Sequence, residues 1–176
     1  MLGLGTMQVG IIVKDMNSAL DKYSKSFNIK NWMKGNFIEE EYIYKGKSIK
    51  IDFTMAYSIR KRLMIELLEV KKGDENVFSH FLDEHGEGIH HLGYYVRNFE
   101  KEIEKYKTMG IDVIQHGCIK SLKGSITRIA ILDTEALYGY AIELLETRIL
   151  GIPIGQSAFI LYIMARLTGD VERIKL

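Results

Sequence analysis

The pentapeptide IELLE occurs twice in the chain, at residues 65–69 and 142–146, and its second residue is a glutamate each time. Side chains of a strand alternate between its two faces, so Glu66 and Glu143 leave the face formed by their Ile and Leu neighbours. Two carboxylates held close together repel each other unless a cation neutralises both of them. The repeated strand therefore indicates two equivalent polar positions at which cation chemistry is possible.

A second repeat supplies two further polar positions. The segment QVGIIVKDMNSALDKY (8–23) matches HLGYYVRNFEKEIEKY (91–106) at a constant offset of 83 residues. Gln8 thereby corresponds to His91, and by strand alternation both side chains point away from the helix that follows. The chain is thus read as a duplication that gathers four polar groups around one pseudo-twofold axis. These groups are Gln8, Glu66, His91 and Glu143.

One amide, one imidazole and two carboxylates are the donors of a mixed nitrogen and oxygen metal site. Such a set suits Zn, Ni, Co, Mn or Fe, whereas a closed structural zinc site favours cysteines. The alternative is that His91 is a core histidine and that both glutamates are solvated strand residues. Because the placement is duplicated, we favour one divalent metal ion as cofactor, held by all four residues.

Each copy is predicted to form a βαβββ module. A strand over 9–13 precedes a helix capped by Asp15 or Asn17, and a strand over 92–96 precedes a helix capped by Asn98. Six further strand-like runs follow at 37–44, 48–56, 62–69, 111–115, 126–132 and 139–146. The expected organisation is module one over 1–72, a linker helix over 73–88, module two over 89–147 and a C-terminal helical extension over 148–176.

Composition narrows the classes of function. The net charge of +1, from 24 basic and 23 acidic residues, argues against nucleic acid as a partner. The single cysteine, Cys118, cannot form an internal disulfide, and no secretory signal is recognisable, so we expect a cytoplasmic protein. The most apolar segment, 158–165, is too short to span a membrane. It lies in an apolar helical stripe, for which we expect structural cover or a homodimer contact. The stripe consists of Phe159, Ile160, Ile163, Met164 and Leu167.

Over roughly residues 6–147 the motifs QVGIIVKD, IELLEV, GEGIHHLGYYV and YAIELLE resemble the vicinal oxygen chelate superfamily of glyoxalases, bleomycin-resistance proteins and dioxygenases. VFSHFLDEHGEGIHH resembles the module junction of methylmalonyl-CoA epimerases. The resemblance implies an α+β fold in which both modules form a curved sheet around a metal pocket, with Gln8, Glu66, His91 and Glu143 as ligands. Epimerases generally have His at the position of Gln8, whereas eukaryotic glyoxalase I has Gln. Extradiol dioxygenases require two His ligands, which disfavours their chemistry here.

The resemblance also implies a reaction, namely proton transfer beside a carbonyl of the lactoylglutathione lyase or methylmalonyl-CoA epimerase type. The small-molecule substrate would then be a thioester or a hemithioacetal. By the same resemblance Glu143 is the expected base, and Asp52 is the nearest match to a second catalytic carboxylate. We expect His90 to pack or hydrogen-bond beside the site. The alternative function is a metal-free or non-catalytic ligand-binding protein of the same fold, of the drug-sequestering, bleomycin-resistance type.

Overall fold

The computed structural model describes residues 7–120, 125–149, 151–154 and 172–175. The strands are β1 (Met7–Ile12), β2 (Asn31–Tyr44), β3 (Lys47–Arg60), β4 (Leu63–Gly73), β5 (Gly88–Tyr95), β6 (Val113–Lys120), β7 (Ser125–Leu132), β8 (Ala141–Ile149), β9 (Ile152–Ile154) and β10 (Glu172–Lys175). The helices are α1 (Met16–Phe27), α2 (Val77–His85), α3 (Phe99–Thr108) and α4 (Glu135–Tyr138).

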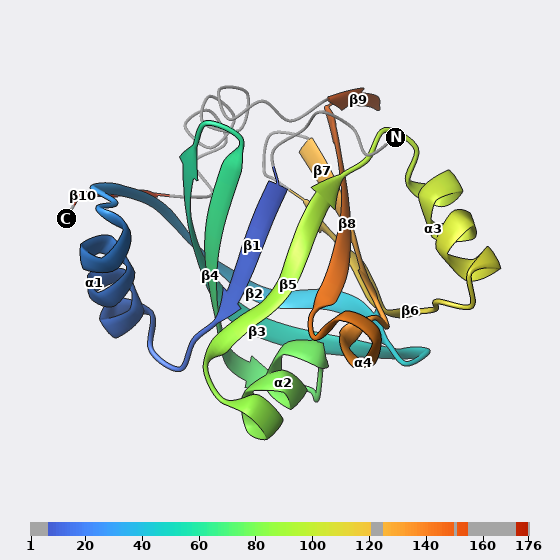
Figure 1. Ribbon diagram of the computed structural model, residues 1–176, viewed down its shortest axis with the longest axis horizontal. Coiled ribbons are helices and arrows are strands. Elements are labelled where there is room, and N and C mark those ends of the chain that lie inside the picture. Colours follow the sequence, from blue (N-terminus) through green and yellow to red (C-terminus); the bar gives the residue numbers. More distant parts are fainter. Residues whose placement is uncertain (1–6, 121–124, 150, 155–171, 176) are drawn as a thin grey trace.

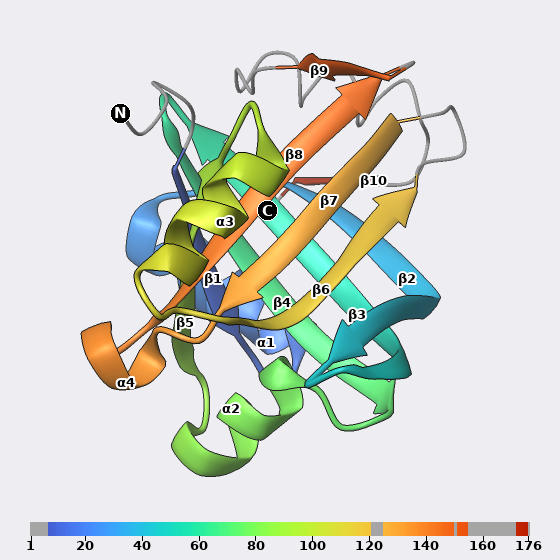
Figure 2. The same ribbon diagram turned by 90° about the vertical axis from the view of Figure 1, so that its right-hand side faces the viewer.

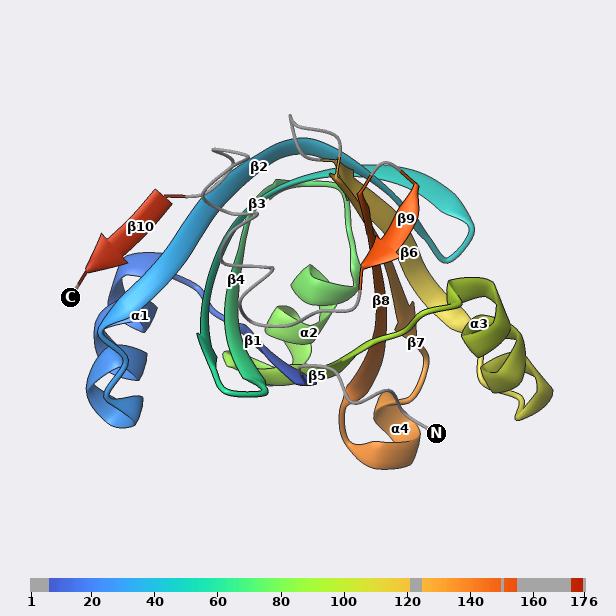
Figure 3. The same ribbon diagram turned by 90° about the horizontal axis from the view of Figure 1, so that it is seen from above.

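The strands form one sheet in the order β10-β2-β3-β4-β1-β5-β8-β7-β6, and β9 pairs with β8. An additional pairing between β2 and β6 joins the two ends of the central eight strands. The sheet therefore closes into a barrel, which Figure 3 shows from above. Helix α2 lies across the lower end of this barrel in Figure 1.

The two predicted βαβββ modules are present. Module one contains β1, α1, β2, β3 and β4, and module two contains β5, α3, β6, β7 and β8 in the same order. The first strands of the modules, β1 and β5, pair antiparallel at the centre of the sheet. Helices α1 and α3 lie on opposite sides of the barrel in Figure 1, and Figure 2 shows α3 in front of the strands of module two. This arrangement gives the barrel its pseudo-twofold symmetry.

Side-chain caps fix where the module helices begin. The Asp15 carboxylate accepts a hydrogen bond from Ser18 N at 2.8 Å, and the Asn98 amide oxygen accepts one from Lys101 N at 3.1 Å. Each bond satisfies a backbone donor that the first helical turn leaves without a partner. Asn98 and, of the two candidates in module one, Asp15 are therefore confirmed as caps. The caps place the helices directly after the strands that carry Gln8 and His91.

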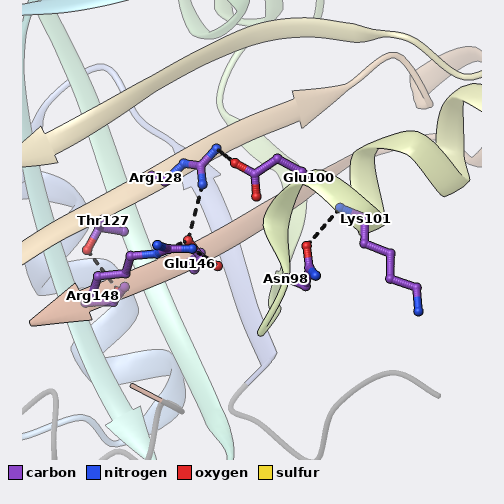
Figure 4. A network of polar contacts seen from close by, with 8 residues as sticks. Asn98, Glu100, Lys101, Thr127, Arg128, Glu146 and Arg148 are labelled. Atoms are coloured by element: carbon purple, nitrogen blue, oxygen red, sulfur yellow. Dashed lines mark hydrogen bonds and ion pairs between the residues drawn. The ribbon is translucent and has the colours of Figure 1, made fainter. Parts of the chain in front are cut away.

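The last glutamate of each IELLE copy faces outward and anchors the helix of its own module. Glu69 accepts a hydrogen bond from the backbone of Met16, at the start of α1, at 3.1 Å. Glu146 is almost fully buried and lies 3.4 Å from the Arg128 guanidinium, which also pairs with Glu100 of α3 (Figure 4). The two glutamates of each IELLE copy thus have different tasks. The first, Glu66 or Glu143, points into the barrel, whereas the last, Glu69 or Glu146, holds a helix on the outside.

The structure departs from the predicted boundaries in several places. Strands β2 and β3 are longer than the predicted runs, and β6 begins later than its run. The single-turn helix α4 was not predicted. The predicted apolar helical stripe lies outside the described residues, and the described segments on either side of it form β9 and β10. Among the described residues, no helix combines the length and the apolar character that a membrane span requires.

Candidate metal centre

The four predicted donors meet inside the barrel, on the four adjacent strands β4, β1, β5 and β8. Gly10 is the register partner of both Glu66 and His91, and Gly93 is the partner of both Gln8 and Glu143. All four donor side chains are buried, with exposed fractions between 0% and 6%. They are contributed by one chain and by both modules.

The Gln8 amide nitrogen lies at the centre of the cluster. Its Nε2 donates to Glu66 Oε2 at 2.7 Å and to Glu143 Oε2 at 3.0 Å, and it lies 3.3 Å from His91 Nε2. His91 Nε2 is itself 3.4 Å from Glu143 Oε2. The Tyr95 hydroxyl donates to Gln8 Oε1 at 3.3 Å. The cluster is therefore a connected set of polar groups that share one small volume.

Two glycines make room for this cluster. A Cβ atom on Gly10 would overlap the imidazole of His91, and a Cβ on Gly93 would lie 2.8 Å from Gln8 Cβ and 3.0 Å from Glu143 Oε2. Gly10 and Gly93 are equivalent positions of the sequence repeat. At each position the missing side chain leaves the space that a donor from the other module fills. These are close approaches of the kind that only glycine permits.

Burial decides the charge state of the cluster. It raises the pKa of Glu66 to about 8, and burial together with the neighbouring Glu66 raises the pKa of Glu143 well above its usual range. The pKa of His91 is lowered well below its usual range by burial and then by His90. Without a cation, this environment favours neutral side chains, whereas a divalent ion would favour both carboxylates.

The donor set fits a divalent ion on one condition, namely that the Gln8 side-chain amide rotates. Among the residues that the structure describes, no three His, Cys, Asp or Glu side chains are spaced as ligands of a single ion. The Gln8 amide accounts for this spacing, because its nitrogen lies between Glu66, His91 and Glu143. An amide also carries an oxygen acceptor, so rotation of Gln8 would offer an oxygen ligand in place of the nitrogen. With that rotation, one nitrogen and three oxygen donors are available, a set that borderline divalent ions accept.

The structure does not bring Asp52 to this cluster. Tyr57 of β3 is the register partner of Glu66, and alternation along β3 places Phe53 on the same face as Tyr57 and Asp52 on the opposite face. The Asp52 carboxylate lies 3.8 Å from Lys72 Nζ. The family resemblance pointed to Asp52 without knowledge of its strand register, and a shift of one residue in a strand moves a side chain to the other face.

His90 lies beside the centre for a reason that alternation alone could not predict. The register between β1 and β5 shifts after Gly10, which pairs with His91, so that Ile11 pairs with Ile89 and His90 is left over as a bulge. Its side chain is 1% exposed, and its Nδ1 lies 2.9 Å from His91 Nδ1. The expectation that His90 packs or hydrogen-bonds beside the site is confirmed.

Known proteins share the fold of this chain, and one protein family matches its sequence. No curated protein matches the sequence at a significant level. Similar solved structures include methylmalonyl-CoA epimerase from Mycobacterium tuberculosis, with 21% identity and a TM-score of 0.52 over 82% of this chain and 91% of that chain. A Streptomyces coelicolor methylmalonyl-CoA epimerase variant in complex with 2-nitronate-propionyl-CoA has 17% identity and a TM-score of 0.53 over 81% and 97%. At these identities the likeness concerns the fold alone. Residues 7–127, more than half of the chain, match a family model, and the chain belongs to the Glyoxalase/Bleomycin resistance protein/Dioxygenase superfamily.

Proposed function

We propose that this protein is an enzyme that transfers a proton at a carbon beside a carbonyl, with one divalent ion held by Gln8, Glu66, His91 and Glu143. The observation that carries the proposal is the meeting of these four side chains, two from each module, in the closed interior of the barrel. A bound ion would polarise the substrate carbonyl and stabilise the negative charge that develops on its oxygen.

The residues of the chain have distinct proposed roles. Glu143 takes the proton from the substrate carbon and returns it, a task that requires a carboxylate within hydrogen-bond reach of that carbon. Glu66 and His91 hold the ion. The Tyr95 hydroxyl, which donates to Gln8 Oε1 in this structure, would accept from the amide nitrogen once Gln8 has rotated to offer its oxygen to the ion. Apolar side chains on the neighbouring strands, including Phe37, Phe53, Ile131 and Leu145, exclude water and strengthen these electrostatic interactions.

A cavity of about 680 Å³ supports an anionic substrate. It is lined by residues 28–33, the end of β3 and Arg173, and it includes Tyr57, the register partner of Glu66. Among the described residues of the lining, Lys30, Arg60 and Arg173 are cations and none is Asp or Glu. A CoA thioester carries phosphates and a hemithioacetal of a thiol peptide carries carboxylates, so either substrate class matches this charge.

The experiment that tests the proposal has two parts. Protein purified without added ions is analysed for metal, and we expect near-stoichiometric divalent metal that is lost in Glu66→Ala. Methylmalonyl-CoA and thiol hemithioacetals of methylglyoxal are then supplied in deuterated water with different divalent ions. Exchange of the proton beside the carbonyl supports the proposal and identifies the substrate class. Absence of metal, together with tight binding of an aromatic drug, would instead identify a drug-sequestering protein.

A further inference from the structure

The side chain of His90 is buried beside the donor cluster. Its ring lies against Phe78, Phe81 and His91, with centroid distances of 5.3, 5.1 and 5.2 Å. Its Nδ1 faces His91 Nδ1 at 2.9 Å. Within the described residues its Nε2 is buried and has no hydrogen-bond partner. Nδ1 of His90 is therefore hydrogen-bonded to His91, whereas Nε2 of His90 has no hydrogen-bond partner among the described residues.

A separation of 2.9 Å between two ring nitrogens requires one proton between them. A neutral imidazole has one N–H and one lone pair, so one Nδ1 must donate and the other must accept. If His91 Nδ1 carries the proton, His91 Nε2 presents a lone pair to the cluster and His90 has its proton on Nε2. If His90 Nδ1 carries the proton, His91 has its own proton on Nε2, where Glu143 Oε2 lies 3.4 Å away.

His90 Nε2 does not decide between these two arrangements, because among the described residues it has no hydrogen-bond partner as a donor or as an acceptor. The deciding contacts are at His91 Nε2. The Gln8 amide nitrogen, which can only donate, lies 3.3 Å from that atom, and Glu143 Oε2, 3.4 Å away, already accepts a hydrogen bond from Gln8. A lone pair on His91 Nε2 therefore suits the Gln8 nitrogen and also suits a cation.

We infer that His90 is a positioning residue for His91: its Nδ1 accepts a hydrogen bond from His91 Nδ1, which keeps the lone pair of His91 Nε2 directed at the cluster. This inference rests on the proposed ion at the centre. The shared proton is on His91 Nδ1 and His90 has its own proton on Nε2, both without and with the ion. Both rings are neutral.

Two substitutions separate this role from simple packing. His90→Phe keeps an aromatic ring against Phe78 and Phe81 but removes the partner of His91 Nδ1. His90→Asn retains an amide oxygen that can accept a hydrogen bond from His91. Loss of a residue that orients a histidine ligand typically lowers metal affinity by about 10- to 100-fold. We expect that loss for His90→Phe, and a change of less than about threefold for His90→Asn. His116→Phe, at an exposed position of β6, is the matched control.

The measurements are zinc affinity by chelator competition and the protonation of ring nitrogens by ¹⁵N nuclear magnetic resonance. In wild type we expect His91 to carry its proton on Nδ1 both without and with zinc. Equal zinc affinity of wild type and His90→Phe, or a proton on His91 Nε2 in either state, would overturn the inference. If wild type binds no divalent ion, the proposed function fails instead, and the ion-free spectrum still tests the proton between the rings. If His90→Phe does not fold, the spectra of wild type and His90→Asn carry the test.

Discussion

The imidazole of His91 occupies the space that a side chain at Gly10 would need. The two residues face each other across the central pairing of β1 with β5, and Gly93 stands in the same relation to Gln8 two residues further along that pairing. Each module thus contributes a donor and a glycine that accommodates the donor of the other module. The sequence repeat G-x-x-V, which begins at Gly10 and Gly93, is therefore part of the site as much as the donors are.

We expect Gly10→Ala to displace His91 and abolish metal binding. Overpacking of a buried position typically costs about 1–3 kcal/mol of unfolding free energy, so the barrel should weaken but remain folded. Gly88→Ala is the matched control on β5, because among the described residues a Cβ there would approach only Phe81, at an ordinary distance of 3.8 Å. Metal content and urea unfolding of both variants check the prediction. Full metal content in Gly10→Ala would show that His91 is not a ligand.

The two inward glutamates should respond differently to replacement by glutamine. Glu143→Gln keeps the size and one oxygen donor but removes the base, so the rate should fall by about 10² to 10⁴ while metal binding weakens only moderately. Glu66→Gln removes a charge from the site but no base, so excess metal should restore most of its activity. Deuterium incorporation into the substrate at saturating metal measures both effects. Normal exchange in Glu143→Gln with none in Glu66→Gln would mean that the base lies in module one.

The stability of the chelator-treated protein should fall as the pH rises from 6.5 to 8. Glu66 has a folded pKa of about 8 against an ordinary value of 4.5, so the folded protein binds a proton that the unfolded chain releases. That stabilisation is complete below pH 4.5 and is lost as the pH rises through 8. Glu143, whose pKa is also raised, acts in the same direction.

The two buried histidines act in the opposite direction but over a lower range of pH. The pKa of His90 is lowered by burial to about 4 from 6.5, and that of His91 is lowered as well, so their contribution rises with pH and is complete above about 6.5. Urea midpoints at pH 6.5, 7.2 and 8 in the presence of chelator therefore isolate the carboxylates. Glu66→Gln should have a shallower slope. A wild-type midpoint that rises over this range would contradict the assigned charge states.

Lys30 should contribute to the binding of an anionic substrate without taking part in the reaction. It is an exposed residue of the cationic cavity, whereas Arg60 also donates to the carbonyl of Phe27 and Arg173 to Asn31. An exposed ion pair contributes about 0.2–1 kcal/mol, so Lys30→Gln should raise KM by up to about fivefold at unchanged kcat, and less at high salt. Lys107→Gln, on α3 at the opposite side of the barrel, is the control. Equal KM values for the two variants would place the substrate elsewhere.

Much of the fold could be predicted from the sequence because duplication and alternation are both visible in it. The offset between Gln8 and His91 revealed the modules, and the alternation of side chains along a strand placed Glu66 and Glu143 on the correct face. Three features could not be predicted in this way. The bulge that leaves His90 over depends on how β5 pairs with β1, the closure of the barrel depends on a contact between β2 and β6, and Asp52 faces outward because of its register. All three are properties of strand partnership, which local sequence does not encode.

The two modules meet along two seams, β1 with β5 and β2 with β6, and these seams pair residues far apart in the chain, such as Gly10 with His91 and Tyr42 with Gly117. The hairpins β2–β3 and β6–β7 join nearby residues and should form earlier during folding, because closing a long loop has a higher entropic cost. The donor cluster spans the first seam, so it assembles only when the halves dock. A bound ion would then select the fully docked chain over half-folded states and slow the separation of the halves, which makes ion occupancy a determinant of how long the protein survives against proteolysis.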